Sequence, residues 1–116
     1  MLLRILKSKL HRATITETVL EYEGSLTLAR EFIEAAGFVP YEEVLCGNFE
    51  NGKRWHTYII PTNRPGVVGL NGPVAHLGKV GDTLVVMAFA LLTEEEAEHF
   101  IPRVVVLGDG NEIKAR

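Results

Sequence analysis

Short runs of apolar and alternating residues, separated by glycine, proline and asparagine, dominate this chain of 116 residues. Many of these runs are rich in Thr, Ile and Val, which favour the pleated, half-buried surface of a β-strand. Asn51-Gly52 is typical of a hairpin turn because both residues tolerate positive φ, and Pro61 is expected to close the strand that follows. One run is continuously apolar, which predicts a buried strand at residues 83–92. The predicted strands are residues 10–19, 44–49, 54–60, 67–70, 83–92 and 103–107.

Two segments carry helical signals instead. Four apolar residues fall on one face of the first helix, which Gly37 is placed to end. The second helix opens with the capping-box pattern of Thr93 and Glu96, and it must end before Pro102. Many short strands with two small helices predict an all-β fold, arranged as a closed barrel rather than a parallel α/β sheet. The four apolar residues of the first helix are Leu28, Phe32, Ile33 and Ala36.

Length and charge narrow the class of protein. A chain of this length fits one domain, residues 1–116, since domains commonly run to ~100–200 residues. The 12 basic and 15 acidic residues give a net charge of −3, which argues against a nucleic-acid binder because phosphates require a basic excess. The lone Cys46 excludes an intrachain disulfide. With four scattered histidines, it offers no metal-ligand spacing, so no metal is expected.

The hydropathy pattern predicts a cytoplasmic protein. Charged residues interrupt every apolar stretch near the N-terminus, so no signal peptide is expected. The most apolar run, residues 83–93, is well short of the ~20 residues needed to cross a bilayer, so no membrane partner is expected.

The dipeptide Gly24-Ser25 is the most informative motif, because of its context rather than its composition. A basic segment, residues 9–16, precedes it, and further motifs follow it in a fixed order. In this order the segments resemble those of the pyruvoyl-dependent aspartate 1-decarboxylase family. The resemblance covers nearly the whole chain and weakens after about Pro102. The segments that follow are residues 51–58, 71–76 and 80–82.

The resemblance implies a six-stranded double-psi β-barrel and a chain that cuts itself between Gly24 and Ser25. The products are a small chain, residues 1–24, and a large chain, residues 25–116, which begins with a pyruvoyl group in place of Ser25. Glycine suits position 24 because it permits unusual φ and ψ and puts no side chain beside the attacked carbonyl. A hydroxyl such as that of Thr57 can polarise this carbonyl.

The resemblance also implies the reaction. The pyruvoyl carbonyl forms a Schiff base with L-aspartate and accepts electrons as the α-carboxylate leaves as CO2, which yields β-alanine for pantothenate and coenzyme A synthesis. The family forms homotetramers with sites between subunits. The sequence leaves open whether cleavage is spontaneous or needs an accessory maturation protein.

Two cations, Lys9 and Arg54, match the family's substrate-binding positions, and a guanidinium can hold a carboxylate through two parallel hydrogen bonds. Tyr58 matches the family's proton donor, which suits a phenol that is protonated at neutral pH. Thr57 and Tyr58 are neighbours on a strand, so their side chains point to opposite faces. Both can serve active sites only if these sites lie at subunit boundaries.

Residues 71–75 match a family loop that wraps the pyruvoyl group and the substrate. Backbone amides in such a turn can hold a carboxylate, although proline supplies none. His11 and Tyr22 flank the cleavage region, where a supporting role and a purely structural role are equally open. His76 is interpreted as structural. The loop residues assigned to substrate binding are Gly72, Pro73 and Val74, and Asn71 is a third candidate for a supporting role.

The chain departs from the family at a few positions. Gly47 stands where many relatives have tryptophan, so a wall of the pocket is built differently, with Trp55 as one candidate. His56 replaces a small polar residue, and Pro73 and Val74 replace alanines. Three alternatives stay open: a barrel that binds a small acid without self-cleavage, a DNA-binding module that uses its basic N-terminal strand, and a pyruvoyl enzyme for another amino acid.

Overall fold

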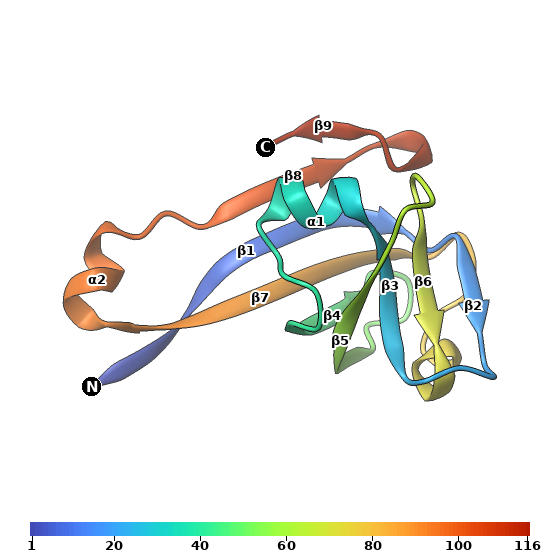
Figure 1. The fold of residues 1–116 in the computed structure, drawn as a ribbon, viewed down its shortest axis with the longest axis horizontal. Helices are drawn as coiled ribbons and strands as arrows, with labels where there is room; N and C mark the ends of the chain where they lie inside the picture. The colour runs from blue at the N-terminus through green and yellow to red at the C-terminus, as the bar shows by residue number, and fades with distance from the viewer.

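The computed structural model describes residues 1–116 and contains nine β-strands, two α-helices and two 3₁₀ turns. The predicted all-β class with two short helices is therefore confirmed, but the chain forms nine strands where the resemblance implied six. In chain order the elements are β1 (Leu2–Thr14), β2 (Glu17–Val19), β3 (Ser25–Ala29), α1 (Arg30–Ala36), β4 (Glu43–Asn48), β5 (Arg54–Thr62), β6 (Val68–Asn71), η1 (Gly72–His76), β7 (Thr83–Thr93), α2 (Glu94–His99), β8 (Arg103–Leu107), η2 (Asp109–Asn111) and β9 (Ile113–Ala115) (Figure 1).

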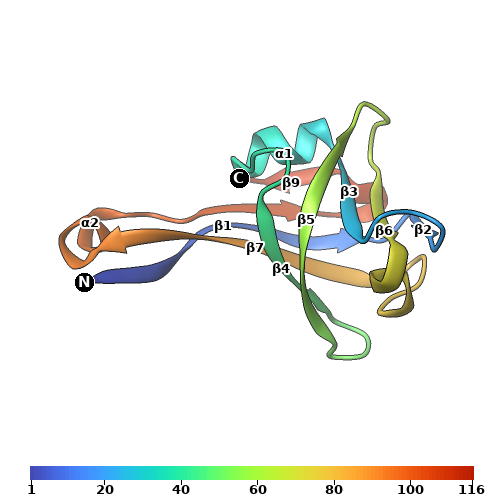
Figure 2. The same cartoon turned by 60° about the horizontal axis from the view of Figure 1, so that its bottom comes forward.

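The strands form one sheet in the order β2-β6-β3-β5-β4-β7-β1-β8-β9. β2 lies at one end of this order and β1 near the other, yet only Ile15 and Thr16 separate them along the chain. The bend between them is held by backbone bonds, from Ile15 N to Asp82 O at 2.9 Å and from Thr16 N to Val68 O at 2.8 Å. The sheet therefore turns back on itself and encloses the core, as Figures 1 and 2 show from two sides.

The inward side chains form one cluster of 22 buried hydrophobic residues. Phe32 of α1 is fully buried in this cluster, and α1 contacts β1, β3, β5 and β8. Burial of a side chain of this kind stabilises the fold by about 1.5–3 kcal/mol. The short helix therefore covers part of the core and does not form a separate layer.

The first predicted strand is wrong at both ends. β1 begins earlier, at Leu2, because its whole length pairs with β7. The sequence pattern did not predict this early start, because charged residues such as Lys9 interrupt the apolar run. These residues face outward and alternate with the buried Ser8 and Leu10. At the other end the chain bends, and residues 17–19 pair with β6 as the separate strand β2.

Two further expectations are corrected. Leu28 lies in β3 rather than on the first helix, which begins at Arg30. Pro61 does not close β5, which continues to Thr62. Proline is tolerated there because β4 pairs with β5 only as far as Tyr58, so the missing N–H interrupts no bond to β4.

The prediction that residues 83–92 are buried holds for one face only. Leu84, Val86 and Ala88 are fully buried, whereas Val85 and Met87 are half-buried on the outer face. A continuous apolar run on an alternating strand therefore leaves an apolar outer surface.

Several local predictions are confirmed. α1 ends at Gly37 with φ +72°, and Thr93 and Glu96 form both hydrogen bonds of the capping box. The turn at Asn51-Gly52 joins β4 to β5, with Gly52 at φ +72°. β4, β6 and β8 lie within one residue of their predicted bounds.

The N-terminal half of β1, the C-terminal half of β7 and α2 project together beyond the rest of the sheet (Figures 1 and 2). Met1, Leu2, Leu91 and Ile101 on this projection are exposed, so the chain does not cover its apolar surface there. No helix has the length and apolar character that crossing a membrane requires.

Asn111 ties the C-terminal segment to the sheet. Its side chain accepts a hydrogen bond from Thr14 N at 2.8 Å and donates to Thr14 O at 2.9 Å and to Gly66 O at 3.1 Å. The residue is buried and lies at φ +58°, a conformation that asparagine tolerates better than most residues.

We expect Asn111→Ala to lower the free energy of unfolding by about 2–3 kcal/mol, since buried backbone groups lose their partners. Urea unfolding of chains that also carry Ser25→Ala, so that every molecule has the same covalent structure, measures this loss. The control is Asn63→Ala, which removes one exposed contact with Arg30 and is expected to change stability by less than about 0.5 kcal/mol. Similar small losses for both variants would contradict the role of Asn111.

Candidate active site

Ser25 is the first residue of β3 and is fully buried, directly after an exposed turn. Its hydroxyl donates a hydrogen bond to Glu23 O at 2.8 Å and accepts one from Asn71 Nδ2 at 2.9 Å. Ser25 and Asn71 are also partners in the antiparallel pairing of β3 with β6. The side chain at the predicted cleavage position is therefore held from two sides.

The turn after β6 packs backbone against backbone on the segment before Ser25. Gly72 has φ +66°, and a Cβ atom there would lie 2.7 Å from both Gly24 N and Tyr22 O. A Cβ at Gly24 would in turn lie 3.4 Å from Pro73 Cδ. Only glycine fits at position 72, so the predicted loop and the predicted cleavage position are brought together.

The other loop residues lie differently. Pro73 is exposed, whereas Val74 is half-buried and packs against the hydrophobic core rather than projecting freely from the turn. His76 is exposed at the end of η1. The contact with the segment before Ser25 is thus made by the first part of the loop.

A cavity of about 290 Å³ lies beside this contact, on the outer face of β2, β3, β5 and β6. Tyr22, Thr27 and Asn71 are among its lining residues. So are Glu17 and Arg64, whose side chains form a two-bond ion pair with N–O distances of 2.7 and 2.9 Å. The hydrogen bond from Arg64 lowers the pKa of Glu17 below its usual value.

Sequence reasoning missed three of these lining residues, Thr27, Glu17 and Arg64. The ion pair joins positions 47 residues apart, which no local pattern relates. The weak available signal was Gly69, where a Cβ atom would lie 3.0 Å from Glu17 Cγ. A glycine inside a strand often marks such a close approach.

Thr57 and Tyr58 point to opposite faces of β5, as predicted. Thr57 is buried on the inner face, and Tyr58 is half-buried on the outer face, stacked on Tyr41 with ring centroids 6.5 Å apart. β3 and β5 are parallel, with Leu26 opposite Ile59. If this register is continued, Tyr58 is level with Ser25 and Thr57 is level with Gly24 along the strands. The members of each pair are then one strand spacing apart, about 4.8 Å.

Lys9 and Arg54 lie elsewhere on the sheet. Lys9 is opposite Met87, Met87 is opposite Leu45, and Leu45 is opposite His56, two residues after Arg54. The two cations therefore share the outer face of β1, β7, β4 and β5 but are separated by three strand spacings, about 14 Å. We call this surface the cation face.

One chain does not assemble the whole predicted site. Arg54 is four residues from Tyr58 along β5, so it lies about 13 Å from the level of Ser25. Neither Lys9 nor Arg54 lines the cavity beside Ser25. The structure thus groups Gly24, Ser25, Asn71 and Gly72 in one place and the two cations in another.

Of the supporting candidates, Asn71 lies next to Ser25, and the other two separate in the same way. Tyr22 lines the cavity beside Ser25. His11 lies on the cation face, in edge-to-face contact with Phe49 at a centroid distance of 5.6 Å. Burial lowers the pKa of His11, and the charges of Lys9 and Arg12 lower it further, so the imidazole tends to be neutral.

Gly47 leaves a gap on the cation face, between its partners Arg54 and Val85. A cavity of about 140 Å³ lies here, and Phe49 is part of its lining. Trp55 was one candidate for replacing the missing wall, but it points inward and is buried in the core. That expectation was therefore wrong, because the alternation of β5 puts Trp55 on the face opposite Arg54.

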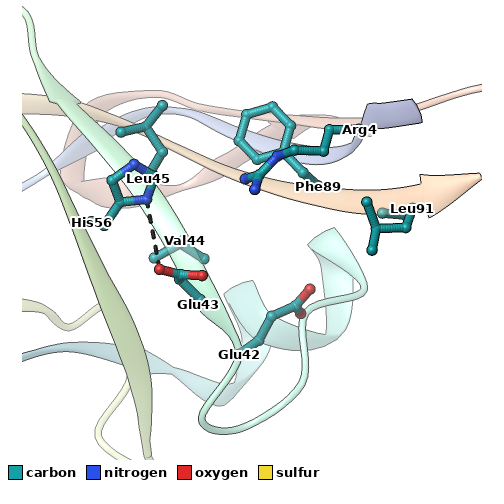
Figure 3. Close-up of a pocket in the computed structure, with 9 residues that line it drawn as sticks. Arg4, Glu42, Glu43, Val44, Leu45, His56, Phe89 and Leu91 are labelled. Carbon is teal, nitrogen blue, oxygen red and sulfur yellow. Dashed lines mark ion pairs between the residues drawn. The ribbon is translucent and has the colours of Figure 1, made fainter. Parts of the chain in front are cut away.

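A third cavity, of about 230 Å³, lies between β1, β4, β5 and β7 (Figure 3). The guanidinium of Arg4 lies 5.7 Å from the centroid of the Phe89 ring, and His56 Nδ1 lies 3.8 Å from Glu43 Oε2. None of the residues predicted for the site lines this cavity. It belongs to the outer surface rather than to the surroundings of Ser25.

The sequence pattern of the aspartate decarboxylase family matches residues 1–114. The aspartate 1-decarboxylase of Caldicellulosiruptor saccharolyticus is 46% identical over 114 residues, which cover 97% of this chain and 89% of that protein. The aspartate 1-decarboxylase of Phenylobacterium zucineum is 44% identical over 115 residues, 98% of each chain. That of Carboxydothermus hydrogenoformans is 43% identical over 114 residues, 97% of this chain and 90% of the relative.

Matches of this extent put the chain among the decarboxylases, enzymes of the carbon–carbon lyase class. It belongs to the aspartate decarboxylase family. The resemblance carried by the motifs around Gly24-Ser25 is thereby confirmed.

Two contributions of Gly72 to stability, its close contact with backbone atoms and its positive φ, can be measured separately. Gly66 has a similar φ, +73°, but no atom lies within 4 Å of the position of its Cβ. We expect Gly66→Ala to cost about 1–2 kcal/mol for the left-handed conformation alone. Gly72→Ala should cost that amount and about 1–3 kcal/mol more, because the new methyl group collides with backbone atoms. Urea unfolding of both variants, again with Ser25→Ala, measures the difference, and equal losses would contradict the packing of the turn.

Proposed function

We propose that this enzyme decarboxylates L-aspartate to β-alanine and CO2, supplying pantothenate and coenzyme A synthesis, with a pyruvoyl group that the chain makes from Ser25. Self-cleavage between Gly24 and Ser25 would give chains of residues 1–24 and 25–116. The observation that carries this proposal is the buried Ser25 hydroxyl, held next to the turn at Gly72. The substrate is supported by relatives that are named aspartate 1-decarboxylase.

The surroundings of Ser25 fit a pyruvoyl group. The side chain is fully enclosed, and the Asn71 amide offers an N–H donor 2.9 Å from its oxygen. Gly24 puts no side chain on the upstream carbonyl, and Thr57 is level with Gly24 in the register of β3 and β5. When present, the group supplies an electron sink for the electrons left behind as the carboxylate departs.

The remaining roles follow from chemistry and position. Arg54 and Lys9 would hold the carboxylate that aspartate retains, Arg54 through two parallel hydrogen bonds. Tyr58, level with Ser25, would donate the proton that the α-carbon needs. Gly72 and Val74 can offer backbone amides to a carboxylate, whereas Pro73 has none to offer.

The enzyme would work as a homotetramer with its sites between subunits. Sites shared between subunits are supported by the geometry of one chain, in which Arg54 lies about 13 Å from the level of Ser25 and about 14 Å from Lys9. A cation face from a second copy, placed over the cavity beside Ser25, removes this difficulty. The apolar outer side chains of β7, such as Val85 and Met87, lie on that same face and favour its coverage by another subunit.

We also propose that the ring of strands is the double-psi β-barrel. Counted with β1 and β2 as one bent strand, the closed part of the sheet has six strands, and β8 and β9 extend it. Parallel pairing of β2 with β6 and of β3 with β5, beside the antiparallel pair of β3 and β6, supports the proposal.

Self-cleavage and substrate binding make separate predictions. We expect purified wild-type protein to give two masses in an intact-mass spectrum, the larger with a ketone terminus. Cleavage in the absence of other proteins would also show that no accessory maturation protein is needed.

Arg54→Ala should cleave normally but lose about 100-fold in kcat/KM for aspartate, the effect of losing a charge-assisted pair of hydrogen bonds. Lys53→Ala, which removes the neighbouring positive charge, is the control, and a wild-type kcat/KM in Arg54→Ala would remove Arg54 from the site.

A site shared between subunits predicts complementation. Ser25→Ala lacks the pyruvoyl group, and Arg54→Ala lacks the cation, so each alone is expected to be nearly inactive. Coexpression in equal amounts should restore about a quarter of wild-type activity, since a random assembly pairs an intact Ser25 with an intact Arg54 in that fraction of interfaces. Purified mixed tetramers and an aspartate decarboxylation assay measure this, and activity no higher than in the single variants would contradict a shared site.

A further inference from the structure

Three polar side chains are buried next to one another on the outer face of β3 and β6. Ser25 is 0% exposed, Asn71 is 2% exposed and Thr27 is 7% exposed. Asn71 Nδ2 lies 2.9 Å from Ser25 Oγ and 2.7 Å from Thr27 Oγ1. Buried polar groups are almost always hydrogen-bonded, so one amide serves both hydroxyls.

The contacts of Ser25 determine which way this amide faces. Ser25 Oγ lies 2.8 Å from Glu23 O, and a carbonyl oxygen can only accept. The single hydroxyl proton of Ser25 is therefore directed at Glu23. Oγ can then only accept from Asn71, so the amide nitrogen rather than the amide oxygen faces the serine. One proton of this amide goes to Ser25 and the other goes to Thr27.

Thr27 is what keeps the amide in this orientation. The terminal torsion of an asparagine is broad and nearly two-fold, so the nitrogen and the oxygen can exchange places at little cost. The hydroxyl of Thr27, at 2.7 Å, gives the second amide proton an acceptor. Without that acceptor, Asn71 can rotate away and no longer direct its N–H at Ser25.

We propose that Thr27 is a positioning residue for self-cleavage: it holds the Asn71 amide so that its N–H donates to Ser25 Oγ. The proposal rests on the proposed function, because it concerns the formation of the pyruvoyl group. Thr27 contacts Asn71 rather than Ser25, and it acts on the cleavage position through this amide.

The N–H donor acts on the atom where charge develops. Ser25 Oγ attacks the carbonyl carbon of Gly24, the C–N bond breaks, and the hydroxyl proton ends on the Ser25 nitrogen, which leaves an ester. Loss of the Cα proton then breaks the Cβ–Oγ bond, and Oγ leaves as part of the Gly24 carboxylate. Water adds to the resulting dehydroalanine in its imine form, and ammonia leaves, which gives the ketone.

Oγ carries negative charge in two of these steps, first as the nucleophile loses its proton and again as the carboxylate leaves. A preorganised N–H donor aimed at that oxygen stabilises both transition states. The geometry therefore assigns the Thr27 hydroxyl an effect on the rate of cleavage.

The test compares Thr27→Val, which keeps the shape but loses the hydroxyl, with Thr27→Ser, which keeps the hydroxyl. Fresh precursor is incubated, and the fraction of cleaved chain is followed by intact mass over time. We expect Thr27→Val to cleave about tenfold more slowly, the effect of one neutral hydrogen bond, and Thr27→Ser to stay within about twofold of wild type. Thr18→Val, at an exposed position on β2, is the matched control. A wild-type rate in Thr27→Val, or equal slowing in Thr27→Ser, overturns the proposal.

A double-mutant cycle separates positioning from mere packing. In chains that carry Asn71→Ala, adding Thr27→Val should change the cleavage rate by less than about twofold, because the amide that Thr27 holds is gone. Additive slowing would contradict the role of Thr27. A wild-type chain that stays whole would overturn the proposed function and this role together, whereas cleavage with an unchanged Thr27→Val rate overturns the role of Thr27 alone.

Discussion

The approach of Gly72 to the backbone of Tyr22 and Gly24 is the constraint on which the site depends. With 2.7 Å between the position of a Cβ at residue 72 and two backbone atoms, the turn after β6 cannot shift without moving the start of β3. The same contact aligns Asn71 opposite Ser25 in the antiparallel pair. A buried serine, its amide donor and the turn beside it are therefore one packed unit, made rigid by backbone contact rather than by long side chains.

Alternation along the strands divides the functional groups between two surfaces. On β5, Thr57 faces inward while Arg54 and Tyr58 face outward, and the register with β3 brings only the later part of β5 level with Ser25. Lys9 is held on the same outer surface as Arg54 by the ladder of β1 with β7. The cations stay partly exposed with no acidic partner, so their charge is available to an anion. A site divided in this way agrees with the proposed sharing of the site between subunits.

Local signals predicted much of the fold, and tertiary contacts account for what they missed. The turn at Asn51-Gly52 and the helix end at Gly37 depend on the conformational freedom of a few residues, which the sequence displays directly. Leu28 was assigned to the helix because an apolar residue just before a helix fits both the helical and the strand periodicity. Its pairing between β3 and β5 makes it part of the strand. Gly24 and Gly72 were named from a resemblance, whereas Thr27 had no local signal, since its importance lies in a contact with a residue 44 positions away.

Gly47 and Val85 pack closely against each other on the cation face. A Cβ atom at position 47 would lie 3.3 Å from Val85 Cγ1, so a larger residue there requires Val85 to move. The two positions are therefore coupled in size. The aromatic surface next to this gap comes from Phe49, whose ring contacts His11 and lies 5.6 Å from the guanidinium carbon of Arg12. Phe49, the residue after β4, lines the same cavity as Arg54, while Trp55 remains in the core.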